Sequence, residues 1–380
     1  MTPALRIVHV VDRLNPQMGG LPMVAARLSA AMARAGHEVV LAATDAGTHG
    51  HRWNDLPGMD AVRVVELPAG RWAGIPSAYH RLVTPERTIL HLHGAWDLSL
   101  RTAAAAARHV ARPYLLTPHG MLDPWSLRQS RLKKWLAMHA THRAMHRRAA
   151  AIHVLNVAEG ELIDPLGWSI QKVVIGNGVD LEEIDRGLLA EPPGDLPSRP
   201  TVLFLGRLHH KKSPTLLAEA FDHLIRRGND LSLAMVGPDD GEADAIQAIA
   251  RQGGWADRLS VPGPVYGSAK YHWLRHADAF VLPSQQEGFS VATLEAMACR
   301  TPVLLSPECH FEDAGEAGAG AIVPRNALAI AKKLEQWFES SKLREEMGRQ
   351  GRRWVEAYGT WDRIAEAMIS AYRHIERTAS

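Results

Sequence analysis

Two segments in the second half of the chain carry charged residues in an arrangement that suits a diphosphate. In the first, Arg207 and Lys212 lie five residues apart, after Gly206, in the loop that follows the apolar run Thr201–Leu205. An arginine offers phosphate oxygens a bidentate fork, and a lysine offers a compact positive charge. The loop therefore predicts a diphosphate site, although a solvated basic loop would have the same composition.

The second segment, Glu287–Val291, comes after the apolar run Ala279–Leu282 and is followed by Glu295. A helix that begins near Ser290 would turn its first backbone N–H groups toward an anion. We expect this anion-binding turn to comprise Gly288, Phe289, Ser290 and Val291. Glu287 can then hold sugar hydroxyls and Glu295 ribose hydroxyls on either side of the phosphates. Alternatively, Glu295 only compensates the helix dipole.

Two glycine-containing turns in the first half are further candidates. Gly19 and Gly20 lie just before a helical pattern over Val24–Ala35. Glycine there lets the backbone approach a ligand, and the helix start favours an anion. His119 and Gly120 follow an apolar run, and polar residues at the carboxyl ends of parallel strands line ligand crevices. Either segment can instead be an ordinary turn.

Short apolar runs alternate with helical patterns such as Val24–Ala35, Pro214–Arg227 and Val291–Cys299. The predicted strands are Leu5–Val11, Val39–Ala43, Val62–Leu67, Thr88–Leu92, Pro113–Thr117, Ala151–Leu155, Lys172–Ile175, Thr201–Leu205, Leu231–Val236, Leu259–Val261, Ala279–Leu282, Pro302–Leu305 and Ala321–Val323. Most of these runs are continuously apolar, which is typical of parallel strands covered on both faces. The pattern predicts an α/β fold with doubly wound parallel sheets.

The alternation is interrupted once, between Arg186 and Pro200, by four prolines and two glycines. Such a composition continues neither a helix nor a central strand. We therefore predict an N-terminal Rossmann-like domain over residues 1–185, a linker over 186–200 and a C-terminal Rossmann-like domain over 201–361. A final helix over 362–380 is expected to pack back on the first domain.

The bulk composition limits the function classes. The 380 residues carry a formal net charge of +2 and only two cysteines, Cys299 and Cys309. The balanced charge does not indicate nucleic acid, and the absence of a disulfide framework favours a reducing cytoplasm. No apolar run is long enough to span a membrane, and no signal-peptide pattern occurs. The sequence has no D-x-D motif, so we expect no metal and no cofactor.

A basic stretch over Leu127–Arg148 predicts a helix on an anionic membrane surface. The residues assigned to this surface are Arg131, Lys133, Lys134, Trp135, Arg143, Arg147 and Arg148, with further apolar side chains between them. An ordinary solvated face is the main alternative, and a nucleic-acid surface is a weaker one.

Together these motifs resemble the retaining glycosyltransferase family 4, which has the GT-B fold. Glu287 and Glu295 match the E-x7-E motif of that family, and Gly206, Arg207 and Lys212 match its G-R-x-x-x-x-K pattern. Further matches, in order, are Gly19-Gly20, His119-Gly120 and Asn177–Asp180. The resemblance extends from residue 5 to about residue 360, and it implies two domains that face a cleft.

The resemblance also implies roles for the site residues. It assigns Arg207 and Lys212 to the diphosphate, Glu295 to the ribose and Glu287 to the donor sugar. His119, Arg207, Lys212 and Glu287 would form the catalytic set, with Gly19 and Gly20 beside the reacting carbon. The remaining donor-binding residues would be Asn177, Gly206, Gly288, Phe289, Ser290 and Val291. In retaining members the leaving diphosphate takes the acceptor proton, so charge stabilisation and positioning replace an enzyme nucleophile.

These observations predict a retaining hexosyltransferase that uses a UDP- or GDP-sugar. The expected acceptor is a growing glycan on a polyprenyl diphosphate, presented to a cytoplasmic enzyme at the inner face of the cell membrane. Alternatives are a soluble small-molecule acceptor, a nucleotide-sugar epimerase and a noncatalytic nucleotide-sugar-binding module. A dinucleotide oxidoreductase is disfavoured because Asn15, Gln17 and Met18 stand where a G-x-G-x-x-G pattern would need glycines.

Overall fold

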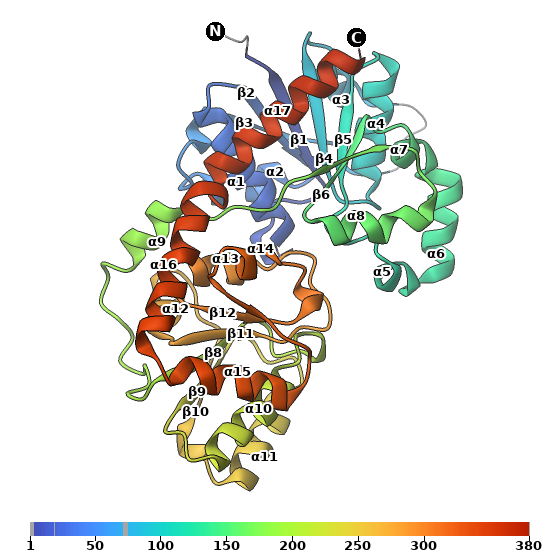
Figure 1. Ribbon diagram of the computed structural model, residues 1–380. Coiled ribbons are helices and arrows are strands. Elements are labelled where there is room, and N and C mark those ends of the chain that lie inside the picture. The colour runs from blue at the N-terminus through green and yellow to red at the C-terminus, as the bar shows by residue number, and fades with distance from the viewer. Residues whose placement is uncertain (1–3, 19, 71–74, 380) are drawn as a thin grey trace. The chain divides into compact units, whose positions relative to one another are not determined.

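The chain folds into two compact α/β units. The computed structural model describes residues 4–18, 20–70 and 75–379 (Figure 1). Unit 1 comprises Met1–Asn177 and Trp361–Ser380, and unit 2 comprises Gly178–Thr360. Each unit contains one parallel sheet with helices packed on it, so the predicted fold class is confirmed. Gly19 lies outside the described residues.

Unit 1 contains a seven-stranded sheet with the order β3-β2-β1-β4-β5-β6-β7. Its strands are β1 (Arg6–Val11), β2 (Glu38–Ala43), β3 (Val62–Glu66), β4 (Thr88–His93), β5 (Tyr114–Thr117), β6 (Ala151–Val154) and β7 (Gln171–Val174). All seven were predicted. The inner strands are covered on both faces and are mostly apolar, whereas the edge strands β3 and β7 are partly exposed. The order reverses between β1 and β4, which is the doubly wound arrangement.

Helices cover both faces of this sheet (Figure 1). They are α1 (Gly20–Arg34), α2 (Ala46–His49), α3 (Ser77–Val83), α4 (Leu98–His109), α5 (Pro124–Arg128), α6 (Arg131–Leu136), α7 (Arg143–Arg147), α8 (Val157–Ile163) and α17 (Trp361–Ala379). One face packs on α1 and α17, which contact each other, and the core there includes Ile7, Met32 and Tyr372. The other face packs on α3 and α4 through a separate core.

Unit 2 contains a six-stranded parallel sheet with the order β10-β9-β8-β11-β12-β13. Its strands are β8 (Thr201–Leu205), β9 (Ser232–Val236), β10 (Leu259–Gly263), β11 (Ala279–Leu282), β12 (Val303–Leu305) and β13 (Gly320–Ile322). Its helices are α9 (Leu181–Gly187), α10 (Pro214–Arg226), α11 (Ala243–Gly253), α12 (Ser268–His276), α13 (Val291–Ala298), α14 (Asp313–Glu316), α15 (Ala327–Phe338) and α16 (Ser341–Tyr358). The order reverses between β8 and β11, so those two strands flank the switch point.

The units differ from the predicted domains at their boundaries. Unit 2 begins at Gly178, whereas the sequence predicted a boundary at residue 185 and a linker over 186–200. Val179 forms a parallel bridge with Thr360, and Ile184 of α9 is buried in the core of unit 2. The proline-rich segment is therefore an irregular part of unit 2. A switch in packing partner, and not a break in secondary structure, sets the boundary.

The basic stretch over Leu127–Arg148 is not one helix, which corrects the sequence prediction. It comprises the end of α5, α6, a π-helical turn (Ala137–Thr141) and α7. Ser130 separates α5 from α6 because its φ of 54° lies outside the helical region. Met145 and His146 of α7 are fully buried, so the interior of unit 1 dictates the direction of this last helix.

Candidate functional site

The switch point of unit 2 brings the two charged segments of the sequence together. In doubly wound sheets, ligands bind beyond the carboxyl ends of the strands where the order reverses. Gly206 follows β8 and the loop 283–290 follows β11, and these strands are neighbours in the sheet. Gly237, at the end of β9, has a φ of 144°, and a Cβ there would lie 1.9 Å from the Gly206 carbonyl oxygen. Glycine is therefore required for this close approach of two backbones.

Lys212 and Glu287 form an ion pair between the two loops. The Lys212 ammonium donates to Oε1 of Glu287, which also accepts from the Ser284 hydroxyl at 2.9 Å. The Glu287 side chain is only 7% exposed, so its charge needs these partners. The backbone supports the contact, because the Glu287 N–H donates to the Glu308 carbonyl at 3.1 Å.

Arg207 lies apart from this pair. Its side chain is exposed, and its nearest carboxylate is that of Asp240 at 3.6 Å. At that distance and exposure the interaction contributes little, about 0–1 kcal/mol. The guanidinium is therefore free to move to another anion at low cost, whereas Lys212 is held.

The helix that the sequence predicted near Ser290 is present. Ser290 is the N-cap of α13, and its hydroxyl accepts from the Thr293 N–H at 3.2 Å. Val291 is the first helical residue, so it belongs to the first turn, whose N–H groups have no partner within a helix. Phe289 precedes the cap, and its ring packs edge-on against that of Phe311 with centroids 5.8 Å apart. Gly288 is exposed.

A second ion pair at α13 was missed in the sequence. Glu295 is 12% exposed and accepts from the Lys270 ammonium of α12 at 2.6 Å. Lys270 also lies over the Tyr271 ring, 4.8 Å from its centroid. No local pattern in the sequence links residues 270 and 295, because the contact depends on how α12 and α13 pack. The two glutamates thus each hold a lysine, one before α13 and one within it.

In unit 1, the structure places the predicted residues separately. Gly20 is the first residue of α1 and is exposed, while its neighbour Gly19 is not described. Asn177 is buried at the end of the segment after β7. His119 follows β5 with a φ of 50°, and the Gly120 N–H donates to the buried Glu159 carboxylate at 2.7 Å. That bond fixes the turn that presents His119.

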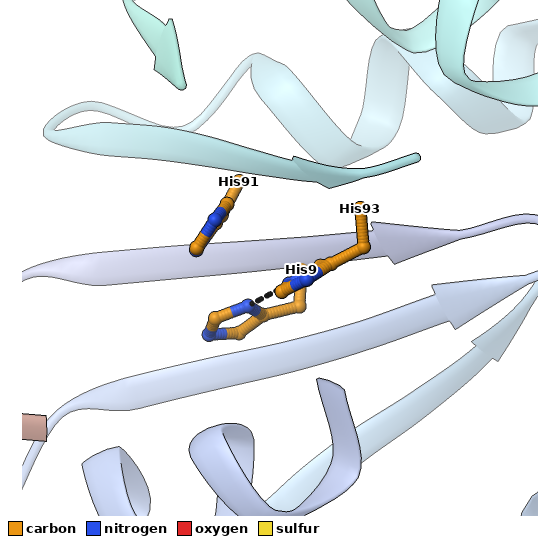
Figure 2. A group of neighbouring side chains, drawn as sticks. All are labelled: His9, His91 and His93. Atoms are coloured by element: carbon orange, nitrogen blue, oxygen red, sulfur yellow. Dashed lines mark hydrogen bonds between the residues drawn. The ribbon is translucent and has the colours of Figure 1, made fainter. Parts of the chain in front are cut away.

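His119 is the outermost member of a histidine cluster that the sequence analysis missed. The other four histidines are fully buried side chains on the strands beneath it: His9 on β1, His91 and His93 on β4, and His153 on β6. Figure 2 shows His9, His91 and His93, with His9 and His93 joined by a hydrogen bond of 2.9 Å between Nδ1 and Nε2. The alternation His91-Leu92-His93 on a strand was a usable signal, because residues two apart share a face.

These histidines are neutral at pH 7. Burial lowers the pKa of His9 to about 3 and the pKa of His153 to about 4. The pKa values of His91 and His93 lie well below the usual value. Burial is the largest cause, and the neighbouring imidazoles lower them further. Burial also lowers the pKa of His119 to about 3. The cluster therefore adds polarity to the core without adding charge.

Among the described residues, His9, His91 and His93 are the one group whose nitrogens lie close enough together to hold a metal ion. Their nitrogens already bond to other atoms. His9 and His93 bond to each other, while His91 bonds to Tyr372 at 2.6 Å and to Thr117 at 2.5 Å. A metal would have to replace these hydrogen bonds, so the group is better described as a hydrogen-bonded network.

Helix α6 presents apolar side chains to solvent. Leu132, Trp135 and Leu136, which share one face, are 77%, 57% and 57% exposed. A groove of about 410 Å³ lies beside them, lined by Leu127, Arg128, Arg131, Lys134, Trp135, Met138, His139 and Leu166. Five basic residues assigned to this surface are exposed, namely Arg131, Lys133, Arg143, Arg147 and Arg148. Lys134 instead is half-buried and donates to the Ser126 carbonyl at 2.7 Å. Within the described chain, no helix combines the length and apolarity needed to cross a bilayer.

Comparison with protein families matches both units. The family described as "Glycosyl transferases group 1" matches residues 191–354, within unit 2. The family described as "Glycosyl transferase 4-like domain" matches residues 19–178, almost wholly within unit 1. The first match covers the sheet of unit 2, and the second begins after β1 and covers the other six strands of the sheet of unit 1.

Curated relatives include two D-inositol 3-phosphate glycosyltransferases. The protein of Frankia alni is 32% identical over 238 residues, which are 57% of this chain and 56% of the relative. The protein of Paenarthrobacter aurescens is 30% identical over 222 residues, which are 56% of this chain and 54% of the relative. The match thus spans about half the length of these curated relatives.

Solved structures share the fold over nearly the whole chain. The sucrose-phosphate synthase of Thermosynechococcus elongatus superposes with a TM-score of 0.70 at 21% identity, covering 98% of this chain and all of the other. Anabaena HepE in complex with UDP and glucose superposes with a TM-score of 0.70 at 17% identity, covering 97% of this chain and all of the other. A glycosyltransferase of Rickettsia africae reaches 0.74 at 16% identity, covering 98% of each chain. At these identities the likeness shows the fold, and the predicted GT-B class is confirmed.

Proposed function

We propose, from the premise that the chain belongs to the family 4 glycosyltransferases, that it transfers a hexose from a nucleotide-sugar to an acceptor hydroxyl. The observation that carries this proposal is the pair of lysine–glutamate contacts at the switch point of unit 2. Lys212 with Glu287 and Lys270 with Glu295 provide two cations and two carboxylates, one pair just before α13 and one on it. A nucleotide diphosphate sugar needs both kinds of group, cations for phosphates and carboxylates for hydroxyls.

The donor is a UDP- or GDP-sugar in this proposal. Anabaena HepE, which shares the fold, is in complex with UDP and glucose. Arg207 and Lys212 would contact the diphosphate, and the N–H groups at the start of α13 would add partial positive charge. Glu295 would hold the ribose and Glu287 the hexose. These roles follow the resemblance to the family.

The reaction would retain the configuration of the sugar and would use neither a metal nor another cofactor. The bond between the anomeric carbon and the diphosphate oxygen breaks, and the acceptor oxygen bonds to that carbon. The acceptor proton passes to the leaving diphosphate. The protein then has two tasks, to stabilise the charge on the leaving group and to hold the acceptor in position. Arg207 and Lys212 suit the first task because both carry fixed positive charge.

We propose that the acceptor is a lipid-linked glycan presented at the cytoplasmic face of an anionic membrane. The exposed apolar face of α6, flanked by Arg131 and Lys133, supports this because an amphipathic basic helix binds such surfaces. The second candidate is a soluble polyol phosphate, which the names of the D-inositol 3-phosphate glycosyltransferases favour. With a radiolabelled donor, the label should enter the organic phase after butanol extraction for a lipid acceptor and the aqueous phase for a soluble one.

A donor screen tests the proposed function directly. Thermal unfolding would be measured with UDP-, GDP- and ADP-sugars, each at a high concentration. A ligand at about 100 times its dissociation constant stabilises the folded state by about 2.7 kcal/mol, or about 5–10 °C for a unit of this size. One nucleotide class should produce this shift, and it should release free nucleotide only when acceptor is present. Release without acceptor, or conversion of one nucleotide-sugar into another, would point to a hydrolase or an epimerase.

A further inference from the structure

Five histidines of unit 1 form two separate hydrogen-bonded chains on the sheet face beneath α1 and α17. The first chain runs from the Met32 sulfur to His9, to His93 and to His119. The second runs from Tyr372 to His91, to Thr117, to His153 and to the Ile175 carbonyl. Each chain ends on an atom that can only accept a hydrogen bond, namely the Met32 sulfur in the first and the Ile175 carbonyl oxygen in the second. The donor and the acceptor of every other bond follow from that end.

The direction of the first chain starts at Met32. A thioether sulfur accepts hydrogen bonds and cannot donate them, so Nε2–H of His9 donates to it at 3.3 Å. A neutral imidazole carries one proton, so Nδ1 of His9 must accept, and Nε2–H of His93 donates to it at 2.9 Å. Nδ1 of His93 then accepts in turn, and Nε2–H of His119 donates to it at 3.2 Å.

The end of this chain determines what His119 offers to a ligand. With its proton on Nε2, the neutral imidazole of His119 has a lone pair on Nδ1. The described residues supply no hydrogen-bond donor to that atom. Unlike the strand histidines, His119 is partly exposed, so a substrate can reach it.

We propose that the Met32–His9–His93 chain sets the tautomer of His119, so that Nδ1 of His119 acts as a hydrogen-bond acceptor that selects a sugar hydroxyl and rejects a carboxylate at the same position. A hydroxyl can donate to Nδ1, whereas a carboxylate or a fluorine presents only acceptors. His9 and His93 are then positioning residues, because they act on the substrate only through His119. The proposal rests on the proposed function and on the catalytic role that the family resemblance implies for His119, because it requires His119 to contact a substrate sugar.

Burial supports the neutral state on which this derivation depends. His9 and His93 are fully buried, and burial is the largest cause that lowers their pKa. A proton added to His9 or His93 would leave two N–H groups facing each other at one of the links, and burial lowers the pKa of His119, at the end of the chain, to about 3. The same low polarity that keeps the rings neutral makes an unmatched link costly.

The second chain provides a matched control. The Ile175 carbonyl accepts from Nε2–H of His153 at 2.7 Å, so Nδ1 of His153 accepts from the Thr117 hydroxyl. Thr117 then accepts from Nε2–H of His91, and the Tyr372 hydroxyl donates to Nδ1 of His91. This chain lies in the same core and has the same kind of bonds, but no bond joins it to His119 among the described residues.

The test is a reversal of the first chain at its anchor. Met32→Leu keeps the volume of a buried apolar side chain and usually costs less than about 1.5 kcal/mol. It removes the sulfur acceptor, so a proton on Nε2 of His9 no longer forms a hydrogen bond. Both directions of the chain then become accessible, and in the reverse direction Nδ1 of His119 carries a proton. Tyr372→Phe removes one buried hydrogen bond from the second chain and should leave His119 unchanged.

The first readout is the tautomer itself. In protein labelled with ¹⁵N-histidine, long-range proton–nitrogen spectra distinguish a protonated ring nitrogen from an unprotonated one, and His119→Gln identifies the signals of His119. We expect Nε2–H for His119 in the wild type and in Tyr372→Phe, and a mixture of tautomers in Met32→Leu. A proton on Nδ1 in the wild type, an unchanged spectrum in Met32→Leu, or a bound metal ion at the three histidines would overturn the proposal.

The second readout is substrate discrimination. UDP-glucose, or the glucose ester of the nucleotide found in the donor screen, would be compared with its deoxyfluoro analogues and with the corresponding glucuronic acid ester. At the position that His119 contacts, wild type and Tyr372→Phe should prefer the hydroxyl by at least about tenfold in kcat/KM, and Met32→Leu should lose most of that preference. Equal discrimination in wild type and Met32→Leu would reject the selection. If the wild type transfers no sugar, the proposed function fails, while the spectra still test the chain.

Discussion

At the scale of single residues, the buried glutamates of the candidate site each form an ion pair with a lysine. Glu287 and Glu295 are nearly buried, and each carboxylate is neutralised by one lysine. This arrangement keeps the charges ready for a ligand without an isolated buried ion, which would be costly. Arg207 is the exception because it is exposed and weakly paired.

The first prediction concerns the diphosphate. Arg207→Ala and Lys212→Ala should each lower kcat/KM by about a hundredfold or more, the usual scale for loss of one group that stabilises charge in the transition state. Steady-state kinetics with the donor identified by the screen would measure this. Arg226→Ala, which removes an exposed arginine paired with Asp222 on α10, is the control and should have nearly wild-type kinetics. Nearly wild-type turnover in both test variants would contradict the site assignment.

Lys212→Ala should also destabilise unit 2, because it leaves the buried Glu287 carboxylate without its cation. The expected loss is about 1–3 kcal/mol in the free energy of unfolding. The double variant Lys212→Met, Glu287→Gln should regain much of this stability but not the activity. Denaturant titration of the three proteins separates the two effects of Lys212.

The second prediction separates the two glutamates. Glu295→Ala should mainly raise the donor KM, since a ribose contact is equal in the ground state and the transition state. Lys270→Met should do the same, because Lys270 holds Glu295 in place. Glu287→Ala should mainly lower kcat, because a contact to the reacting sugar strengthens as charge develops. The reverse pattern in steady-state kinetics would exchange or remove the two roles.

At the scale of elements, α6 is the unusual one. It is a short helix whose residues Leu132, Trp135 and Leu136 are exposed on one face. Single exposed apolar residues are common on proteins, but a cluster of them beside basic residues marks an interaction surface. Lys134 contributes less to that surface, because its ammonium donates to the Ser126 carbonyl and lies 5.6 Å from the Trp96 ring centroid.

The third prediction is that α6 attaches the protein to anionic membranes. Each exposed basic residue near such a surface contributes about 1 kcal/mol, so Arg131→Glu with Lys133→Glu should weaken vesicle binding by at least about a hundredfold. Co-sedimentation with anionic and neutral vesicles would measure this. Lys332→Glu with Lys342→Glu, an equal charge change on exposed lysines of α15 and α16, should have little effect.

Salt and lipid charge provide the counter-test for this surface. Binding should weaken between 0.1 M and 1 M salt, because the Debye length falls from about 10 Å to about 3 Å. Equal sedimentation with neutral vesicles, or no effect from the α6 reversals, would show that α6 is an ordinary solvated helix. The soluble acceptor would then be the better candidate.

At the scale of the whole molecule, the two units differ in which titratable groups have lowered pKa values. Unit 1 buries neutral histidines, whereas the clearly lowered pKa values in unit 2 belong to carboxyl groups such as Asp185 and Glu346, which bond to arginines. Unfolding exposes the histidines to water, where their pKa returns to about 6.5. Acid therefore acts on the two units in different pH ranges.

The fourth prediction is that unit 1 unfolds first as the pH falls below about 6.5. The folded-state pKa is about 3 for His9 and about 4 for His146 and His153, so the unfolded chain binds protons first. Above the pKa of histidine in the unfolded chain, about 6.5, these groups contribute their full stabilisation. As the pH falls below that value, the free energy of unfolding decreases by up to about 1.4 kcal/mol per pH unit for each group. Asp97 and Glu159 oppose this trend, because burial raises the pKa of Asp97 to about 6 and also raises the pKa of Glu159, but they are two carboxyl groups against several histidines.

Hydrogen exchange followed by mass spectrometry between pH 7 and pH 4 would test the order of unfolding. Peptides from β1, β4 and α17 should lose protection before peptides from β8 and β11. Simultaneous loss in both units, or earlier loss in unit 2, would contradict the prediction.

Much of the fold could be read from the sequence by itself. The thirteen strands of the described residues were all predicted, and for most of them the reason is that a parallel strand covered on both faces has a locally apolar sequence. The loops after β8 and β11 were singled out for the same reason, since each follows such a run and carries charge. The unit boundary was misplaced because the change of partner at Val179 leaves no break in the local pattern.

Only the tertiary structure decided which side chains meet. Sequence reasoning placed Glu287 and Lys212 in separate loops, but their contact requires β8 and β11 to be neighbours, and the Lys270–Glu295 contact requires α12 to pack beside α13. His9 and His93 are joined in the same way, because β1 pairs with β4 across the point where the strand order reverses. Local patterns record burial and periodicity, whereas the order of strands in a sheet is a property of the whole packed unit, and the chemistry of this chain depends on that order.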